Sequence, residues 1–199
     1  MRLVLVNNYK EPEKAQEVLR NLTRCTEQPV EVVDRSAPDL VRKVLEMKPE
    51  LVFLSGSNSL LTRLGTRREY QAEMDLVSKA NFPVLGICFG HQLIGTAFGS
   101  GMTDLGEMIK RFEEVRVLDK HPIFDGLPSS IEVAESHRQV LDRIPAGFMR
   151  LAESETSPIE AMCHESRPIY SFQFHPERAD EIRPHGRMII QNLLKLAKS

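Results

Sequence analysis

The sequence has few cysteines: Cys25, Cys88 and Cys163 are widely spaced, and none lies in a CxxC pair. No local cluster of cysteine and histidine offers the spacing of a zinc site. An odd number of isolated thiols also fits no disulfide framework. We therefore predict three free thiols in a reducing, cytoplasmic setting, with no metal and no cofactor.

Long hydrophobic runs and a surplus of charge are missing too. The N-terminal run, MRLVLV, holds about five apolar residues, whereas a membrane span needs about 20 and a signal peptide needs a longer apolar region. Lys and Arg number 26 against 28 Asp and Glu, giving a net charge of −2. This balance offers no basic surface for a polyanion, so we expect neither a membrane nor nucleic acid as a partner.

The size and composition are those of one ordinary globular domain. The chain has 199 residues, of which 41% are hydrophobic and 27% charged. A single core can serve a chain of this length. No internal repeat, low-complexity tract or linker divides it, so we predict one domain spanning residues 1–199.

The first half alternates two kinds of segment. Short, continuously apolar segments occupy residues 2–6, 30–33, 51–54 and 83–87. Segments with helical spacing of apolar residues lie between them, at residues 13–24, 39–47 and 67–80. This βαβαβαβ order predicts a parallel sheet covered by helices on both faces, which is a three-layer α/β sandwich.

The second half has a different pattern. Short strands separated by turn residues are predicted at residues 115–118, 131–134, 149–152, 159–162 and 169–174, followed by a closing amphipathic helix at 186–197. We expect these strands to form an antiparallel addition to the same sheet.

Cys88 interrupts the stretch PVLGICFGHQLIGTAFG, residues 83–99. An apolar strand, a nucleophile between Gly86 and Gly90, and then a helix form the plan of a nucleophile elbow at the C-terminal edge of the sheet, where ligands bind. The helix N-terminus predicts a stabilised thiolate with a lowered pKa. A buried structural cysteine is the alternative that this motif alone leaves open.

The stretch YSFQFHPERADE, residues 170–181, supplies partners for a thiol. A strand ends in His175, and Glu177 follows across Pro176. Because proline restricts His175 to an extended backbone, Glu177 is expected on the same side, beneath the imidazole. A base with an orienting carboxylate is what a thiol nucleophile needs.

GICFGHQ and FQFHPE together resemble the class I glutamine amidotransferases, whose pattern is G-x-C-x-G-x-Q followed by a strand-borne H-P-E. The resemblance covers nearly the whole chain and implies the flavodoxin-like fold of that family, with a mostly parallel central sheet. Four further segments, HPIFDGLP, VAESHRQV, LAESETSPIEAM and PIYSFQFHPE, are most similar to the amidotransferase subunit or domain of GMP synthetase.

The resemblance implies a reaction and its residues. The substrate would be L-glutamine, Cys88 would attack its side-chain amide, His175 would carry protons and Glu177 would orient His175. A γ-glutamyl thioester would release ammonia first and glutamate second.

Two backbone N–H groups are expected to form the oxyanion hole. The N–H of Phe89, next to the nucleophile, is the first candidate. The second is expected from the turn FLSGSNS, at Gly56 and Ser57, where family members usually read S-G-G-P. A positive φ at Ser57 would cost about 1 kcal/mol or more, and on that basis we predict a loop that needs substrate or a partner to form the hole.

Gln92, Ser136 and His137 match positions that the family uses to hold substrate glutamine. Two departures weigh against assigning GMP synthesis outright: Gln139 stands where those enzymes commonly have aspartate, and NNYK, residues 7–10, replaces their G-S-Q-Y type turn.

The chain contains no recognisable ATP-binding motif. We therefore expect ammonia to pass to a separate ATP-dependent synthetase subunit, with that of GMP synthetase as the first choice. Two alternatives remain open: a stand-alone γ-glutamyl hydrolase or peptidase, and a non-catalytic regulatory module of the same fold.

Overall fold

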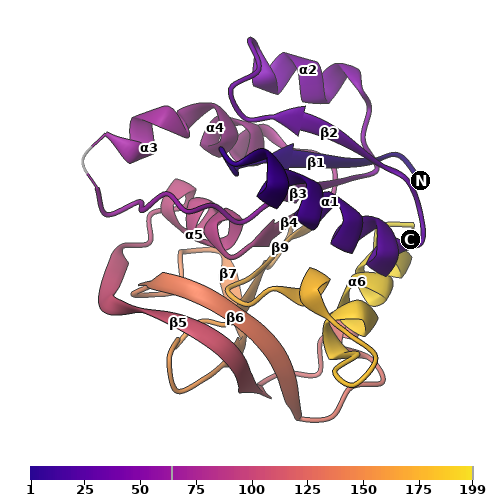
Figure 1. Ribbon diagram of the computed structural model, residues 1–199, viewed down its shortest axis with the longest axis vertical. Coiled ribbons are helices and arrows are strands. Elements are labelled where there is room, and N and C mark those ends of the chain that lie inside the picture. Colours follow the sequence, from indigo (N-terminus) through magenta and orange to yellow (C-terminus); the bar gives the residue numbers. More distant parts are fainter. Residues whose placement is uncertain (64, 199) are drawn as a thin grey trace.

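The computed structural model describes residues 1–63 and 65–198, and within them nine strands form one mixed sheet in the order β2-β1-β3-β4-β9-β8-β7-β5-β6 (Figure 1). The first five strands in this order run parallel to one another, and the four that follow each pair antiparallel with the strand before them. The expected antiparallel addition to a single sheet is confirmed. The last strand differs from its prediction, because it pairs in parallel with β4 and completes the parallel half.

The elements of the first half follow the predicted alternation. Their bounds are β1 (Leu3–Asn7), α1 (Pro12–Thr26), β2 (Val30–Asp34), α2 (Leu40–Glu46), β3 (Leu51–Leu54), α3 (Thr66–Glu69), α4 (Gln71–Lys79), β4 (Val84–Ile87) and α5 (Phe89–Ala97). One predicted helix, residues 67–80, is divided at Tyr70. The Tyr70 ring turns inward, where it contacts Phe89 at 4.6 Å between centroids.

The second half consists of strands and one helix. Their bounds are β5 (Met102–Val117), β6 (Ser130–Leu141), β7 (Phe148–Glu153), β8 (Ala161–His164), β9 (Ile169–Phe172) and α6 (His185–Leu196). β5 and β6 form a hairpin far longer than the strands predicted at residues 115–118 and 131–134. β5 is hidden in the sequence because most of it faces solvent, and β6 because its buried face includes polar residues, Glu135, His137 and Gln139.

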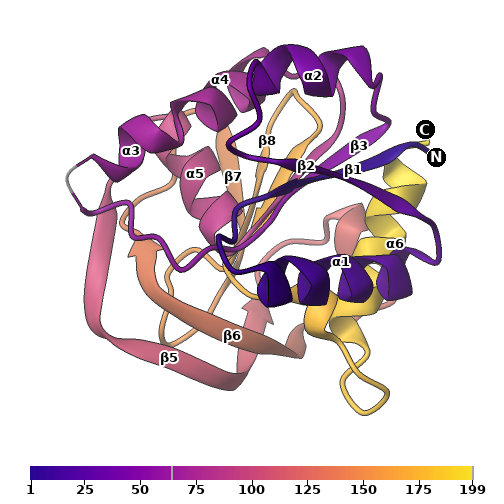
Figure 2. The same ribbon diagram turned by 45° about the horizontal axis from the view of Figure 1, so that its top comes forward.

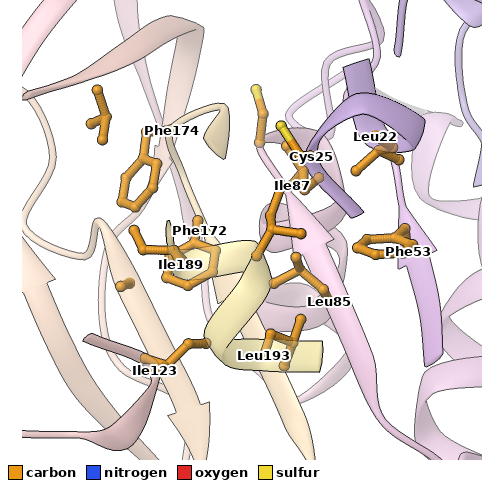
Figure 3. Packing of buried hydrophobic residues seen from close by; sticks show 14 of the residues in the cluster. Leu22, Cys25, Phe53, Leu85, Ile87, Ile123, Phe172, Phe174, Ile189 and Leu193 are labelled. Atoms are coloured by element: carbon orange, nitrogen blue, oxygen red, sulfur yellow. The ribbon is translucent and has the colours of Figure 1, made fainter. Parts of the chain in front are cut away.

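Helices cover both faces of the parallel strands, which confirms the three-layer prediction (Figure 2). Leu3 and Leu5 of β1 pack with α1 and α6, whereas Val4 and Val6 pack with α2, α4 and α5. Successive residues of a strand point to opposite faces, so a continuously apolar strand must be covered twice. Figure 3 shows side chains from α1, α6, β3 and β4 gathered in the first of these cores. Among the described residues, no helix is long and apolar enough to cross a membrane.

The sheet curls in its second half, and this curl builds the site. Ala134 of β6 forms an isolated antiparallel bridge with His175, which lies just beyond β9. The strand that is last in the sheet order therefore reaches the C-terminal edge of the parallel strands. Segments far apart in sequence meet there.

Candidate active site

Cys88 occupies a sharp turn between β4 and α5, with φ 51° and ψ −101°. A positive φ is uncommon for a residue with a side chain and marks local strain. The flanking glycines are required by close packing. A Cβ on Gly86 would lie 2.6 Å from the Gly90 carbonyl oxygen, and one on Gly90 would lie 2.4 Å from that of Leu54. The predicted elbow geometry is present.

The predicted lowering of the Cys88 pKa is wrong. The side chain is only 4% exposed, and burial, followed by the nearby Glu135 carboxylate, raises the pKa of the Cys88 thiol from 9.0 to about 12. This rise of three pKa units corresponds to about 4 kcal/mol of free energy against forming the thiolate. A helix N-terminus typically contributes about 0.3–1 kcal/mol, so burial outweighs it. The residue rests as a neutral thiol, whose proton points to the Ser136 carbonyl at 3.5 Å.

His175 and Glu177 form the expected pair. Nδ1 of His175 lies 2.7 Å from Oε1 of Glu177, and both side chains are buried. The contact is made through a one-turn 3₁₀ helix, Pro176–Arg178, rather than by continued strand. Burial would raise the pKa of Glu177, but His175 and then Arg178 outweigh it and the net pKa is lowered. Glu177 is thus a carboxylate that accepts the Nδ1 proton, which leaves Nε2 for chemistry.

Cys88 and His175 both make hydrogen bonds to the backbone of β6. The His175 backbone N–H donates to the Ala134 carbonyl at 2.8 Å, and the Cys88 thiol donates to the carbonyl of Ser136, two residues along. The Cys88 N–H donates to Phe172 at 2.8 Å, which joins the elbow to β9. Both functional groups are therefore held by backbone contacts to the same pair of strands.

A hollow of about 250 Å³ opens over Cys88. Of the residues predicted from the sequence, it brings together six on its wall: Cys88, Phe89, Ser57, Gln92, Ser136 and His137. His175, Glu177 and Gly56 are not on that wall. Gly56 still adjoins the histidine, because a Cβ there would lie 3.1 Å from Cε1 of His175.

The loop after β3 differs from our prediction in its backbone. Ser57 is not among the described residues with a positive φ, so the expected strain is absent. Its hydroxyl instead fastens the loop by donating to the Asn8 carbonyl at 3.1 Å and by contacting the Tyr70 hydroxyl at 3.2 Å. Within the described part of the chain, no hydrogen bond is made by the N–H groups of Gly56 and Ser57. The loop is therefore held by hydrogen bonds of the Ser57 side chain, without backbone strain at Ser57.

Gln92 and Gln139, the two glutamines that line the hollow, are buried and already make some of their possible hydrogen bonds. Nε2 of Gln92 donates to the Gln139 carbonyl at 2.7 Å and to Oε1 of Gln173 at 3.1 Å. Gln92 therefore joins α5 to the curled strands, and only its carbonyl oxygen is left for a ligand. Gln139, the departure noted in the sequence, keeps its own Oε1 buried without a hydrogen-bond partner beside the hollow.

Tyr9 and Arg178 were missed by sequence reasoning. Both line the hollow. The charge of Arg178 opposes part of the rise in the Cys88 pKa. Nε of Arg178 also lies 3.8 Å from Oε1 of Glu177. Burial raises the pKa of Tyr9, and the nearby positive charge of Arg178 opposes part of that rise. The signal for Tyr9 was its place just after the first strand, at the edge where ligands bind. Arg178 directly follows Glu177 in the sequence.

Comparison with known proteins identifies a family and named relatives. The family model for glutamine amidotransferase class-I matches residues 4–196. The glutamine-hydrolyzing GMP synthase subunit from Thermococcus kodakarensis is 41% identical over 157 residues, covering 78% of this chain and 80% of that protein. The protein of the same name from Methanococcoides burtonii is 32% identical over 199 residues, covering 100% and 97%.

Solved structures show the same fold. A candidate GMP synthase subunit from Thermoplasma acidophilum superposes with a TM-score of 0.81 at 28% identity, covering 100% of this chain and 94% of that one. A glutamine amidotransferase from Thermotoga maritima superposes with a TM-score of 0.76 at 17% identity, covering 100% and 99%.

Proposed function

The chain belongs to the class I glutamine amidotransferases, and from that premise we propose that it hydrolyses the side-chain amide of L-glutamine with Cys88 as the nucleophile. The position of Cys88 carries the proposal: it lies at a strained turn and on the wall of a hollow, and the carboxylate of the buried His175–Glu177 pair is close enough to raise its pKa. A thiol, a base and an orienting carboxylate are the groups that acyl transfer requires.

The proposed reaction has two halves. The Cys88 sulfur bonds to the amide carbon while the thiol proton passes to His175. When the carbon–nitrogen bond breaks, the nitrogen takes that proton and leaves as ammonia. Water then attacks the γ-glutamyl thioester and gives a proton to His175, which returns it to the sulfur as glutamate is released.

Backbone N–H groups would stabilise the negative oxygen of each tetrahedral intermediate. Phe89 offers one, and the loop at Gly56 and Ser57 offers another. Gln92, Ser136 and His137 would contact the rest of the substrate, since all three line the hollow. The positive charge of Arg178 would favour the thiolate as it forms.

We propose that ammonia passes to a separate ATP-dependent synthetase subunit, that of GMP synthesis. The relatives named as glutamine-hydrolyzing subunits of GMP synthase support this assignment, because one subunit of an enzyme implies a companion chain. The neutral Cys88 thiol supports low activity in the isolated chain, because its raised pKa makes formation of the thiolate by proton transfer to His175 unfavourable. A docked partner would then raise the rate, which couples ammonia release to an acceptor.

One assay tests both parts of the proposal. Glutamate production is measured for the wild type and for Cys88→Ala, alone and with the candidate synthetase, ATP and its nucleotide substrate. The proposal predicts a slow wild type that the partner stimulates, and no turnover by Cys88→Ala. Fast cleavage of γ-glutamyl peptides without the partner would assign a stand-alone hydrolase instead. Absence of turnover under every condition would assign a non-catalytic module.

The state of the cysteines supports a cytoplasmic location, which we also propose. All three thiols are free. Free thiols persist in reducing compartments, whereas oxidising ones favour disulfides.

A further inference from the structure

A second group of titratable side chains lies next to the hollow. Glu135 and His137 point to the buried side of β6, two residues apart, and Glu160 reaches them from the position just before β8. One donor atom from each lies within 4.8 Å of the other two. The three residues are at most 2% exposed.

Most of the polar atoms in this cluster have no hydrogen-bond partner. These atoms are both carboxylate oxygens of Glu135, both ring nitrogens of His137 and Oε2 of Glu160. The other Glu160 oxygen accepts from the Ser154 hydroxyl at 2.7 Å, which fixes that side chain. Native proteins rarely leave buried polar atoms unpaired, so a cluster of them that offers one donor atom from each of three side chains indicates a ligand.

The spacing within the cluster fits two ligands of a metal ion. Nε2 of His137 lies 3.2 Å from Oε2 of Glu135, yet the two atoms form no hydrogen bond. Zinc holds nitrogen and oxygen ligands at about 2.0–2.2 Å, and two such ligands about 100° apart are separated by about 3.2 Å. The pair is therefore placed as two ligands of one ion.

We propose that Glu135, His137 and Glu160 bind one divalent transition-metal ion, with Zn²⁺ as the best match. Imidazole and carboxylate are common ligands of this ion, and two carboxylates balance its charge. Each of the three residues offers one donor atom, which leaves the fourth position of a tetrahedral site to a water molecule. No local sequence pattern predicts the site, because Glu160 comes from a different strand than the other two ligands.

The ion would stiffen the strand that holds the nucleophile. Ser136 lies between two of the ligands, and its carbonyl accepts the Cys88 thiol. His137 lines the hollow over Cys88, and Ser154 lines a groove beside β5 and β7, so the cluster adjoins both. This inference concerns metal binding and does not depend on the proposed glutaminase activity.

The test uses Cys88→Ala as the background, so that the nucleophile cannot bind metal itself. After treatment with a chelator, the protein is titrated with Zn²⁺ by calorimetry and its thermal unfolding is followed. We expect one Zn²⁺ per chain and a higher Tm. Adding Glu160→Gln should weaken binding about 100-fold or more, since even outer partners of metal ligands cost about 10–100-fold. Glu165→Gln, an exposed change of the same kind, should leave binding unchanged.

A spectroscopic readout keeps the test decisive if Glu160→Gln does not fold. Co²⁺ added to the Cys88→Ala protein should give the visible absorption of a four-coordinate ion without a thiolate charge-transfer band. The proposal is overturned if this protein binds neither ion at micromolar concentration, or if Glu160→Gln binds Zn²⁺ as tightly as its parent.

Discussion

Replacing Gly56 by alanine tests whether the loop after β3 is packed against the catalytic histidine. A Cβ at this position would lie 2.6 Å from the Tyr9 hydroxyl oxygen and 3.1 Å from Cε1 of His175, whereas ordinary contacts begin at 3.4 Å. The hydroxyl must therefore move by about 0.8 Å and the imidazole by about 0.3 Å, or the loop must withdraw. Overpacking of this kind costs about 1–3 kcal/mol.

The expected result is a fall in kcat of about 10- to 100-fold, because a small displacement of a catalytic group is costly even when the fold survives. The assay is steady-state glutamine hydrolysis in the presence of the synthetase partner, with Tm measured for each variant. Tyr9→Phe removes the atom nearest to the new methyl group, so Gly56→Ala combined with Tyr9→Phe should regain about tenfold in kcat.

Tyr9→Phe alone is the matched control. It removes only the Tyr9 hydroxyl and should have a small effect, about threefold or less, on kcat. The reasoning is refuted if Gly56→Ala keeps the wild-type kcat, or if the double variant is no more active than Gly56→Ala.

The remaining predictions concern the catalytic residues. A diazo-ketone analogue of glutamine should alkylate Cys88 and spare Cys25 and Cys163, because of the three only Cys88 lines the hollow; peptide mapping that found either of the others labelled first would contradict this. His175→Asn should lower kcat by about 10³-fold or more and Glu177→Gln by less, since the carboxylate acts through the imidazole; the reverse order would exchange their roles. Burial lowers the pKa of His175, so its neutral, basic form should persist below pH 6.5, and the acid limb of kcat/KM should lie below that value. Alkylation of Cys88 by iodoacetamide should keep rising with pH beyond pH 9, since its pKa is raised to about 12; a plateau near pH 9 would indicate an ordinary, solvated thiol.

Much of the parallel half could be predicted because its signals are local. In continuously apolar strands and amphipathic helices, the local residue pattern indicates which positions are buried. β3 accordingly begins and ends where the pattern predicts. Gly86 and Gly90 indicated the elbow, since only a missing Cβ allows those close approaches. The His175–Glu177 contact followed from a spacing of two residues.

The remainder depends on contacts between distant segments. The Cys88 pKa follows from how deeply later strands bury the thiol, which the local motif does not specify. The backbone at Ser57 could not be deduced, because hydrogen bonds to Asn8 and Tyr70 fix it. The length of β5 was hidden because a solvent-facing strand carries few apolar residues, and that of β6 because contacts with other segments bury polar side chains along it.

The central claim is that Cys88 carries the glutamyl group during turnover, and acid-quenched mass spectrometry tests it most directly. The protein is mixed with L-glutamine and partner, quenched within the first turnovers, digested and mapped. We predict one γ-glutamyl group on the peptide that contains Cys88, and its loss on mild alkaline treatment, as expected of a thioester. Glutamine hydrolysis that proceeds at the wild-type rate in Cys88→Ala would contradict the account.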